Sequence, residues 1–233
     1  MKHHYARLNA EYIPDYINWV EHGAVSSVKH DYSSCSSSWA HAAIDAIEGD
    51  VFLKTGNAVE LSAQQILDCD HASWGCHGGL FTNAFEYAID NKIMLEKDYP
   101  YVGKPQPCTA DAEKGKVTVT NFVNVLPHDA DQLKVAVKLG PVAASITTSN
   151  KVFQFYKGGV ITSPDCSKLE SPVDSAVTIV GFGHDTHLKV DYWLIKNSWG
   201  KTWGDEGFAR LAIDDNGPGI CNIQTECSVV FTE

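Results

Sequence analysis

The stretch CSSSWA at residues 35–40 opens a segment whose apolar side chains recur at helical spacing. These apolar residues lie three or four positions apart, at Ala40, Ala43, Ile44, Ile47 and Val51. Such spacing predicts a helix, and Gly56 supplies the stop signal that is common just after a helix. The stretch therefore places a run of serines at the start of a long helix.

The segments that follow predict helices first and strands second. Residues 61–67, with Ser62 as N-cap, and residues 81–91 are the next helical candidates, and residues 131–139 form a later one. Short β-rich runs begin at about residue 117, at 117–119, 122–125, 142–146, 177–182, 192–195, 208–213 and 229–231. This order predicts an α+β protein of two lobes, with a ligand site in the cleft between them.

Composition and charge limit the classes of function. The chain has 233 residues, enough for one large domain or for two small ones that share an interface. Its formal net charge of -11 argues against a nucleic-acid partner and against an anionic membrane surface. No apolar run approaches the roughly 20 residues that span a bilayer. We therefore expect no nucleic acid and no membrane among its partners.

Seven cysteines are spread along the chain and form no C-x-x-C pair. A structural zinc site prefers closely spaced pairs of ligands, so disulfides are the favoured interpretation, and we expect neither a metal nor a cofactor. Disulfides imply folding in an oxidising compartment, so the expected location is extracellular, vacuolar or lysosomal. An odd number of cysteines leaves one thiol unpaired.

Four segments together resemble the papain-like cysteine peptidases, of the papain and cathepsin L type. They are residues 13–25 (IPDYINW and GAV), 35–40, 61–79 (LSAQQ, DCD and GCHGG) and 196–207 (KNSWG, WG and G). The second resembles the nucleophile motif CGSCWA, and the segments cover the chain from about residue 13 to 223 in the right order. The resemblance implies a helical lobe at 20–123 packed against a β-barrel lobe at 124–225, with the site cleft between them. Residues 1–19 and 226–233 would then be terminal segments that cross between the lobes.

In this family a cysteine thiolate attacks the peptide bond, a histidine supplies the proton, an asparagine orients the histidine, and a glutamine helps to hold the oxyanion. The resemblance assigns these positions to Ser38, Ser175, Asn197 and Asp31, in that order. Tyr32 is the alternative for the glutamine position when the residues are counted from the other side. Only the asparagine is retained.

The three substitutions remove the chemistry. The pKa of an alcohol lies far above the thiol value of about 8.5, so a helix dipole cannot ionise Ser38 and a positioned base becomes essential. Ser175 cannot accept a proton at neutral pH, and a carboxylate at Asp31 would repel an oxyanion. His41, three residues along the same helix, and His77, in the glycine-rich loop, are the alternative bases. We expect His41 to pack in the interior instead.

These substitutions favour a non-catalytic homologue, a pseudoenzyme that binds or supports other molecules. In that case Ser38 is an N-cap and Asn197 makes a buried hydrogen bond beside Trp199. One alternative is a weak serine-based hydrolase or condensation catalyst of the silicatein type, although silicateins keep the histidine. Another is a cysteine peptidase inactivated in the laboratory by Cys→Ser, which would explain Ser38 but neither Ser175 nor the missing glutamine.

The resemblance also implies disulfides and a peptide-binding cleft. The disulfides would be Cys35–Cys76, Cys69–Cys108 and Cys166–Cys221, which leaves Cys227 as the free thiol. A peptide or protein would lie along the cleft, whose residues are Gly78, Gly79, Leu80, Phe81, Ser145, Val173, Ala176, Trp199 and Glu226. Glu226 would accept a cation at the floor of the main subsite, or else be a solvated carboxylate.

Overall fold

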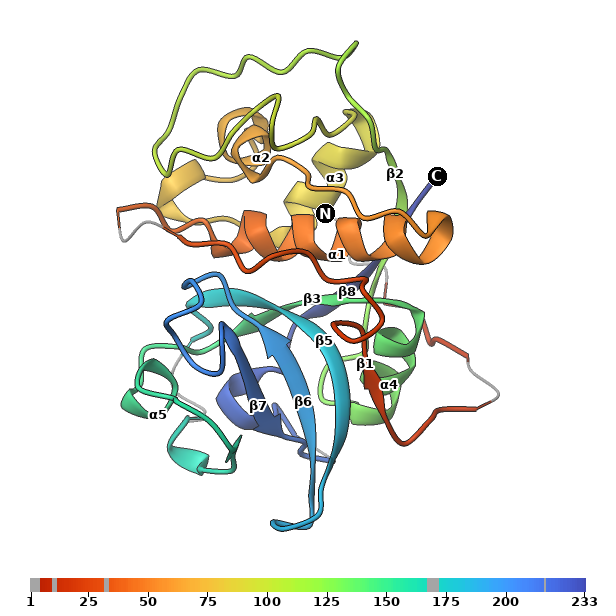
Figure 1. Ribbon diagram of the computed structural model, residues 1–233, viewed down its shortest axis with the longest axis vertical. Coiled ribbons are helices and arrows are strands. Elements are labelled where there is room, and N and C mark those ends of the chain that lie inside the picture. Colours follow the sequence, from red (N-terminus) through yellow and green to blue (C-terminus); the bar gives the residue numbers. More distant parts are fainter. Residues whose placement is uncertain (1–4, 10–11, 32–33, 167–171, 216) are drawn as a thin grey trace.

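Helix α1 (Ser38–Thr55) runs through the middle of the molecule (Figure 1). The computed structural model describes residues 5–9, 12–31, 34–166, 172–215 and 217–233. Small residues of α1, such as Ala40, Ala43 and Ala46, are buried, so other elements can approach the helix closely. A methyl group on Gly49 would lie 2.4 Å from the Pro141 ring, which shows how tightly the turn before β3 packs on α1. The helix ends at Gly56, in the left-handed conformation that glycine favours.

The remaining helices begin at the caps that the sequence provides. Helix α2 (Ala63–Cys69) follows Ser62, whose hydroxyl accepts a hydrogen bond from the Gln65 N–H at 2.9 Å. This confirms the predicted cap. The other helices are α3 (Phe81–Asp90), α4 (Ala130–Leu139) and the short α5 (Lys151–Gln154). Short 3₁₀ turns lie at Gly75–His77, Pro164–Cys166 and Ile220–Asn222.

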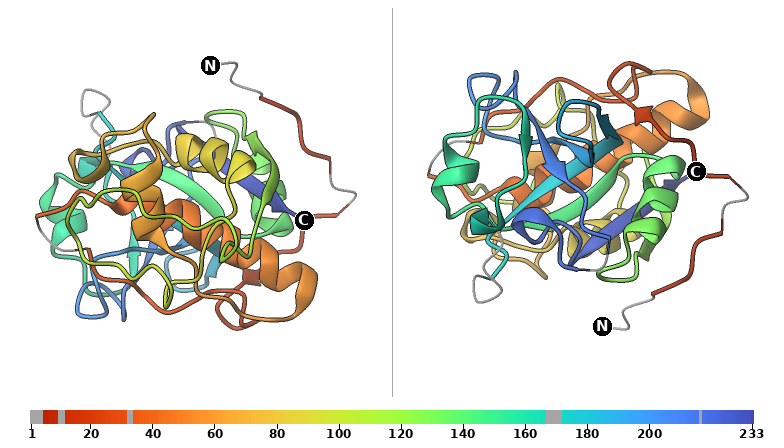
Figure 2. Two further views of the ribbon diagram at one scale, coloured as in Figure 1. Left: turned by 90° about the horizontal axis from the view of Figure 1, so that it is seen from above. Right: turned by 90° about the horizontal axis from the view of Figure 1, so that it is seen from below.

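Eight strands form one sheet in the order β2-β8-β3-β5-β6-β7-β4, and β1 pairs with β5. All neighbours are antiparallel except β4 and β7. The strands are β1 (Ile17–Asn18), β2 (Val119–Asn124), β3 (Val142–Ile146), β4 (Val160–Ile161), β5 (Ser175–Asp185), β6 (Val190–Lys196), β7 (Phe208–Ala212) and β8 (Cys227–Thr232). The sheet curves below α1, and helices α1, α2 and α3 lie together above it (Figures 1 and 2). This is the predicted α+β fold of two lobes.

The strands next to α1 have two buried faces, because successive side chains of a strand point to opposite sides. Ala143, Ala176 and Val230 belong to the core that contains α1, α2 and α3. Ala144 and Val177, one position further along, belong to the second core beneath the sheet. The central strands are therefore shared by both lobes, and their start points are fixed relative to α1.

A buried ion pair also joins the lobes. Lys196, at the end of β6, is 1% exposed, and its Nζ lies 2.8 Å from Asp45 Oδ1 on α1. Lys196 also donates to the Ser26 hydroxyl at 3.1 Å. One turn further along α1, Glu48 accepts a hydrogen bond from the Leu61 N–H at 2.6 Å through one oxygen, and its other oxygen has no partner among the described residues. The helix thus contributes two carboxylates near one cation.

The sequence pattern did not predict the shortest elements. Strands β1 and β4 have two residues each and α5 has four, which is too short for a period to be visible. The lobe boundaries at residues 123 and 225 stay predictions. In the part of the chain that the structure describes, no helix is both long enough and apolar enough to cross a membrane.

The buried Glu48 carboxyl should make the stability of the fold depend on pH. Burial, and secondarily the Asp45 charge, raise the pKa of Glu48 from 4.5 to about 7. The folded protein therefore holds this proton more tightly than the unfolded chain does. The Glu48 contribution to stability is full below pH 4.5 and is lost as the pH rises through about 7.

Between pH 5 and 8 the free energy of unfolding should fall by on the order of 2 kcal/mol more in the wild type than in Glu48→Gln. The glutamine keeps the acceptor for Leu61 but carries no proton equilibrium. Urea denaturation of both proteins at several pH values measures the difference. Parallel pH profiles for the two proteins would contradict the assignment.

Candidate active-site cleft

A disulfide and two hydrogen bonds hold the segment that leads into α1. Cys35 and Cys76 are bonded, and the Ser36 N–H donates to the Cys76 carbonyl at 3.0 Å. The Trp39 indole N–H donates to the Gly75 carbonyl at 3.2 Å. A methyl group on Gly79 would lie 2.6 Å from the Trp39 ring, so this loop must be glycine to pass so close. The start of α1 is thereby fixed beside the glycine-rich loop.

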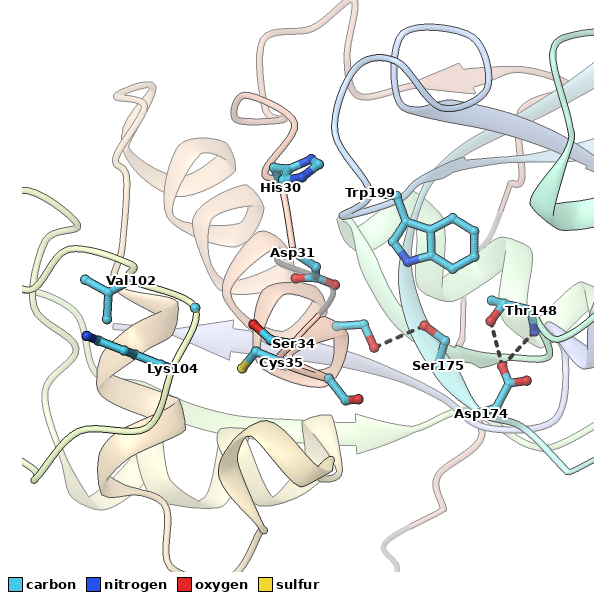
Figure 3. A pocket seen from close by; sticks show the side chains of 13 residues that line it. His30, Asp31, Ser34, Cys35, Val102, Lys104, Thr148, Asp174, Ser175 and Trp199 are labelled. Carbon is cyan, nitrogen blue, oxygen red and sulfur yellow. Dashed lines mark hydrogen bonds between the residues drawn. The ribbon is translucent and has the colours of Figure 1, made fainter.

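The two positions assigned to the nucleophile and the base contact each other directly. The Ser175 hydroxyl donates to Ser38 Oγ at 3.1 Å (Figure 3). The backbone N–H of Ala176 donates to the same oxygen at 3.1 Å. The predicted N-cap role of Ser38 is wrong. The N-cap is Ser37, and Ser38 is the first residue of the helix, so its side chain is free to reach across the cleft to β5.

Asp174 precedes Ser175 and holds the start of β5 in place. Its carboxylate accepts hydrogen bonds from the Thr148 N–H at 2.7 Å, the Thr148 hydroxyl at 2.8 Å and the Ser149 N–H at 2.9 Å. These donors lie on the loop after β3. These bonds connect the start of β5, where Ser175 lies, to the loop after β3.

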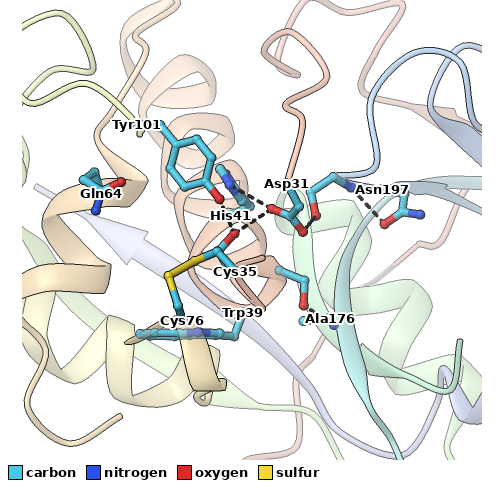
Figure 4. A network of polar contacts seen from close by, with 12 residues as sticks. Asp31, Cys35, Trp39, His41, Gln64, Cys76, Tyr101, Ala176 and Asn197 are labelled. Carbon is cyan, nitrogen blue, oxygen red and sulfur yellow. Dashed lines mark hydrogen bonds and ion pairs between the residues drawn. A yellow bond between two sulfur atoms is a disulfide. The ribbon is translucent and has the colours of Figure 1, made fainter. Parts of the chain in front are cut away.

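Asp31, at the glutamine position, belongs to a network of polar groups that connects the two lobes (Figure 4). Oδ1 accepts from the Ser37 hydroxyl at 2.7 Å, and Oδ2 accepts from the Ser198 hydroxyl at 2.7 Å. The backbone N–H of Asp31 donates to the Ser198 carbonyl at 2.6 Å. The Tyr101 hydroxyl lies 2.6 Å from that of Ser37. The carboxylate is thus committed to neighbours in both lobes.

Neither alternative histidine is placed to act as a base for Ser38. His41 is 3% exposed, as its expected packing requires, and stands edge-on to Tyr101 with ring centroids 4.7 Å apart. Its Nε2 lies 3.0 Å from Asp31 Oδ1, although the two are not aligned for a hydrogen bond. His77 is exposed and lines neither of the two pockets around Ser38.

Asn197 is buried and makes one side-chain hydrogen bond among the described residues. The side chain is 1% exposed, and its Oδ1 accepts the Ser198 N–H at 2.8 Å. Its Nδ2 has no hydrogen-bond partner in the described part of the chain. The hydrogen bond from Ser198 is the buried bond expected of Asn197, whereas a buried amide nitrogen without a partner costs free energy.

The predicted cleft residues gather around Ser38 in two adjoining pockets. The larger, of about 820 Å³, extends over His30, Asp31, Ser38, Asp174, Ser175 and Trp199, with Val102 and Lys104 at its far side (Figure 3). The smaller, of about 180 Å³, also contains Ser38. It brings together eight of the nine predicted cleft residues, Gly78, Gly79, Leu80, Phe81, Ser145, Val173, Ala176 and Glu226. Trp199, the ninth, lines the larger pocket.

Glu226 lies at one end of the smaller pocket. Its Oε2 accepts the Ser145 hydroxyl at 2.9 Å, which ties the side chain to β3. The residue is exposed. In the smaller pocket, Asp174 is the other side chain that carries a formal charge, and its carboxylate is already occupied by the Thr148 loop. The two formal charges that line this pocket are therefore both negative.

The three disulfides implied by the resemblance are all present, and Cys227 is free. The Cys227 thiol is buried at the start of β8, and its Sγ lies 3.1 Å from the Ile223 carbonyl. Burial, with a smaller contribution from the Glu226 charge, raises the pKa of the thiol well above its ordinary value. A thiol that resists ionisation is a poor nucleophile.

Sequence reasoning missed the polar partners of the site. Ser37, Tyr101 and Ser198 around Asp31, and Thr148 on Asp174, come from four separate segments. Ser37 and Ser198 are adjacent to assigned site residues, so only their proximity in sequence could have suggested them. Tyr32, the alternative for the glutamine position, lies outside the described residues. No group of side chains in the described part could hold a metal ion.

Comparisons with known proteins point to one family. Residues 13–231 match the papain family of cysteine proteases. The chain is 42% identical to cathepsin J of Mus musculus, over 88% of this chain and 62% of that protein. It is 41% identical to cathepsin L of Sarcophaga peregrina, over 93% of this chain and 63% of that protein. The chain thus covers less than two thirds of the length of either relative.

Solved structures have the same fold. The proform of the Amb a 11 cysteine protease, a ragweed pollen allergen, superimposes with a TM-score of 0.89 at 37% identity, covering 96% of this chain and 66% of that one. The Carica candamarcensis cysteine protease CMS1MS2, in complex with E-64, gives a TM-score of 0.85 at 32% identity. That match covers 94% of this chain and 99% of the other.

The native protein should not react with a peptidyl epoxide between pH 5 and 7, because Ser38 has no thiol and the buried Cys227 lines neither of the two pockets around Ser38. Mass spectrometry of the intact protein measures the labelling. As a control, the protein unfolded in guanidinium without reductant should take up one iodoacetamide per chain. Rapid stoichiometric epoxide labelling of the native protein would contradict this assignment.

Proposed function

The chain belongs to the papain family of cysteine proteases, and we propose that it is a non-catalytic member that binds peptides in a retained cleft. The observation that carries this proposal is the direct contact between Ser38 and Ser175, where a thiol and an imidazole would have to stand. The proposal covers the absence of peptide-bond cleavage, the retention of binding and the kind of ligand.

The losses in kcat that follow removal of such catalytic groups are large enough to support the absence of catalysis. In serine proteases, removal of the nucleophile or of the base alone lowers kcat by a factor of about 10⁶. Removal of one oxyanion donor costs a further factor of about 10² to 10³. Here the base is replaced by a hydroxyl and the oxyanion donor by the Asp31 carboxylate, whose negative charge would oppose an oxyanion.

A serine-based hydrolase has less support. It requires a base within hydrogen-bond reach of Ser38. In the described part of the chain, the groups bonded to Ser38 Oγ are the Ser175 hydroxyl and the Ala176 N–H, and both are donors. Replacement of a catalytic cysteine in the laboratory would account for Ser38 alone. The Asp31 network involves partners in both lobes and indicates a site remodelled at several positions.

Binding is supported by the cleft that remains. The glycine-rich loop keeps its approach to Trp39, and the cleft residues still surround two pockets. Trp74 is 70% exposed on the loop beside them and offers an aromatic surface. Glu226 favours a lysine or arginine side chain of the ligand in the smaller pocket. The ligand in this proposal is therefore a basic peptide or a protein segment.

The expected compartment is part of the proposal. Three disulfides support folding in an oxidising environment, which fits a secreted, vacuolar or lysosomal protein. A Glu48 carboxyl that holds its proton up to about pH 7 makes the fold more stable in acidic surroundings.

Ser38→Cys combined with Ser175→His should create weak peptidase activity. The double variant restores a thiolate and an imidazole at two positions that α1 and β5 already bring together. Asn197 would then orient the imidazole ring. Cleavage of a fluorogenic peptide should exceed that by Ser38→Cys alone, and adding Asp31→Gln should increase it by about 10².

The matched control is Ser38→Ala with Ser175→His, which has the base without the thiol and should remain inactive. A correctly folded double variant with no activity above this control would show that the site was remodelled beyond these two groups.

The cleft should prefer a cationic ligand through Glu226. An acetylated Ala-Leu-Arg-Gly-amide peptide should bind more tightly than its norleucine counterpart, by several-fold because the carboxylate is partly solvated. Isothermal titration calorimetry on the wild type, Glu226→Gln and the distant surface control Glu113→Gln measures the preference. Glu226→Gln should abolish it and Glu113→Gln should not. Equal affinities in the wild type would refute the cation preference.

A further inference from the structure

The hydrogen bonds at Ser38 determine which way its proton points. A hydroxyl has one donor hydrogen and two acceptor lone pairs. Both acceptor positions of Ser38 Oγ are taken, by the Ser175 hydroxyl and by the Ala176 N–H, each at 3.1 Å. No acceptor for the Ser38 proton lies among the described residues. Because Ser38 is partly exposed and lines both pockets, this proton is available to a bound ligand.

The hydrogen-bonding role of Ser38 toward a ligand is therefore the opposite of the role that a nucleophile has. A nucleophile presents a lone pair to the ligand and gives its proton to a base on the protein. Ser38 presents a proton and uses its lone pairs within the protein. The ligand group that fits such a donor is a hydrogen-bond acceptor, and in a peptide the strongest available acceptor is a carbonyl oxygen.

Asp31 limits the charge of that acceptor. It lines the larger pocket together with Ser38 and Ser175, and its neighbour in the hydrogen-bond network is Ser37, adjacent to Ser38 in the chain. Both of its oxygens are held by hydroxyls, so the carboxylate cannot swing away without breaking bonds to both lobes. Like charges brought together at a binding site cost affinity.

Lys104 is the group of opposite charge in the larger pocket. It lines the pocket from the helical lobe, on the far side of Cys35 from Ser175 (Figure 3). In the same view Asp31 lies on one side of Ser175 and Asp174 on the other (Figure 3). The formal charges on either side of the Ser175 side chain, which is bonded to Ser38, are therefore negative.

We propose that the Ser38–Asp31 pair makes the cleft selective for an uncharged carbonyl over a carboxylate, so that it holds uncleaved peptide chains and rejects peptides whose terminal carboxylate falls at Ser38. This selectivity rests on the proposed peptide-binding function. Ser38 supplies the hydrogen bond, and Asp31 supplies the discrimination. A peptidase in this fold releases a new carboxylate at this position, whereas this chain disfavours such a ligand.

Three acetylated peptides test the selectivity by titration calorimetry at pH 7. The first is Ala-Leu-Arg-Gly-amide, the second is the same sequence with a free carboxylate, and the third is Ala-Leu-Arg-Gly-Gly-Gly with a free carboxylate. The third carries the same charge as the second but places it beyond Ser38, so it separates a local effect from the net negative charge of the protein.

The amide should bind the wild type at least about tenfold more tightly than the short acid, and the extended acid should bind nearly as well as the amide. Asp31→Asn keeps one of the two acceptor oxygens, replaces the other by a donor and removes the charge, so it should reduce the difference between amide and short acid to about twofold. Ser38→Ala should weaken the amide several-fold. Near-UV circular dichroism and urea unfolding confirm that both variants are folded.

Equal binding of the amide and the short acid would overturn the selectivity and leave peptide binding intact. A difference that Asp31→Asn does not reduce, or an extended acid as weak as the short one, would also overturn it, because the discrimination would then lie elsewhere. If none of the three peptides binds, the proposed function fails first, and the selectivity fails with it.

Discussion

The burial of α1 between the two lobes is the constraint on which the rest of the structure depends. Small residues and Gly49 allow β3, β5 and β8 to pack directly against this helix, so the sheet cannot shift relative to it without opening the core. Ser38 begins the helix and Ser175 begins β5. Their contact follows from packing that both lobes share, whichever side chains stand at the two positions.

The substitutions in the cleft satisfy one another. Ser175 donates to Ser38, while Asp31 accepts hydrogen bonds from Ser37 and Ser198. Catalytic groups usually carry strain or unmet polar needs that substrates relieve, whereas these groups have found partners within the protein. Two donors are exceptions, because Asn197 Nδ2 and the Ser38 hydroxyl proton have no acceptor among the described residues. These contacts are what the proposed non-catalytic function expects of a cleft that keeps its shape.

Periodicity and motifs predicted the longer elements well. The spacing in α1, the Ser62 cap of α2 and the Gly56 stop all have local causes, and local causes can be read from a sequence. The papain-like motifs located Ser38, Ser175, Asn197 and the disulfides. The partners of Asp31 were not predictable, because Ser37, Tyr101 and Ser198 meet only after distant segments fold. The N-cap was misplaced by one residue, since the three adjacent serines at 36–38 offer equal local signals and the contact with β5 decides among them.

The measurement that tests the central claim most directly is a search for new peptide termini. A peptide library prepared from a whole proteome is incubated with the wild type and with Ser38→Ala, at pH 5 and pH 7, and the products are identified by mass spectrometry. A protein without catalytic chemistry gives the same peptides in both samples, with no termini that depend on Ser38. Termini that accumulate with the wild type and vanish with Ser38→Ala would show that Ser38 is a working nucleophile and would contradict the account.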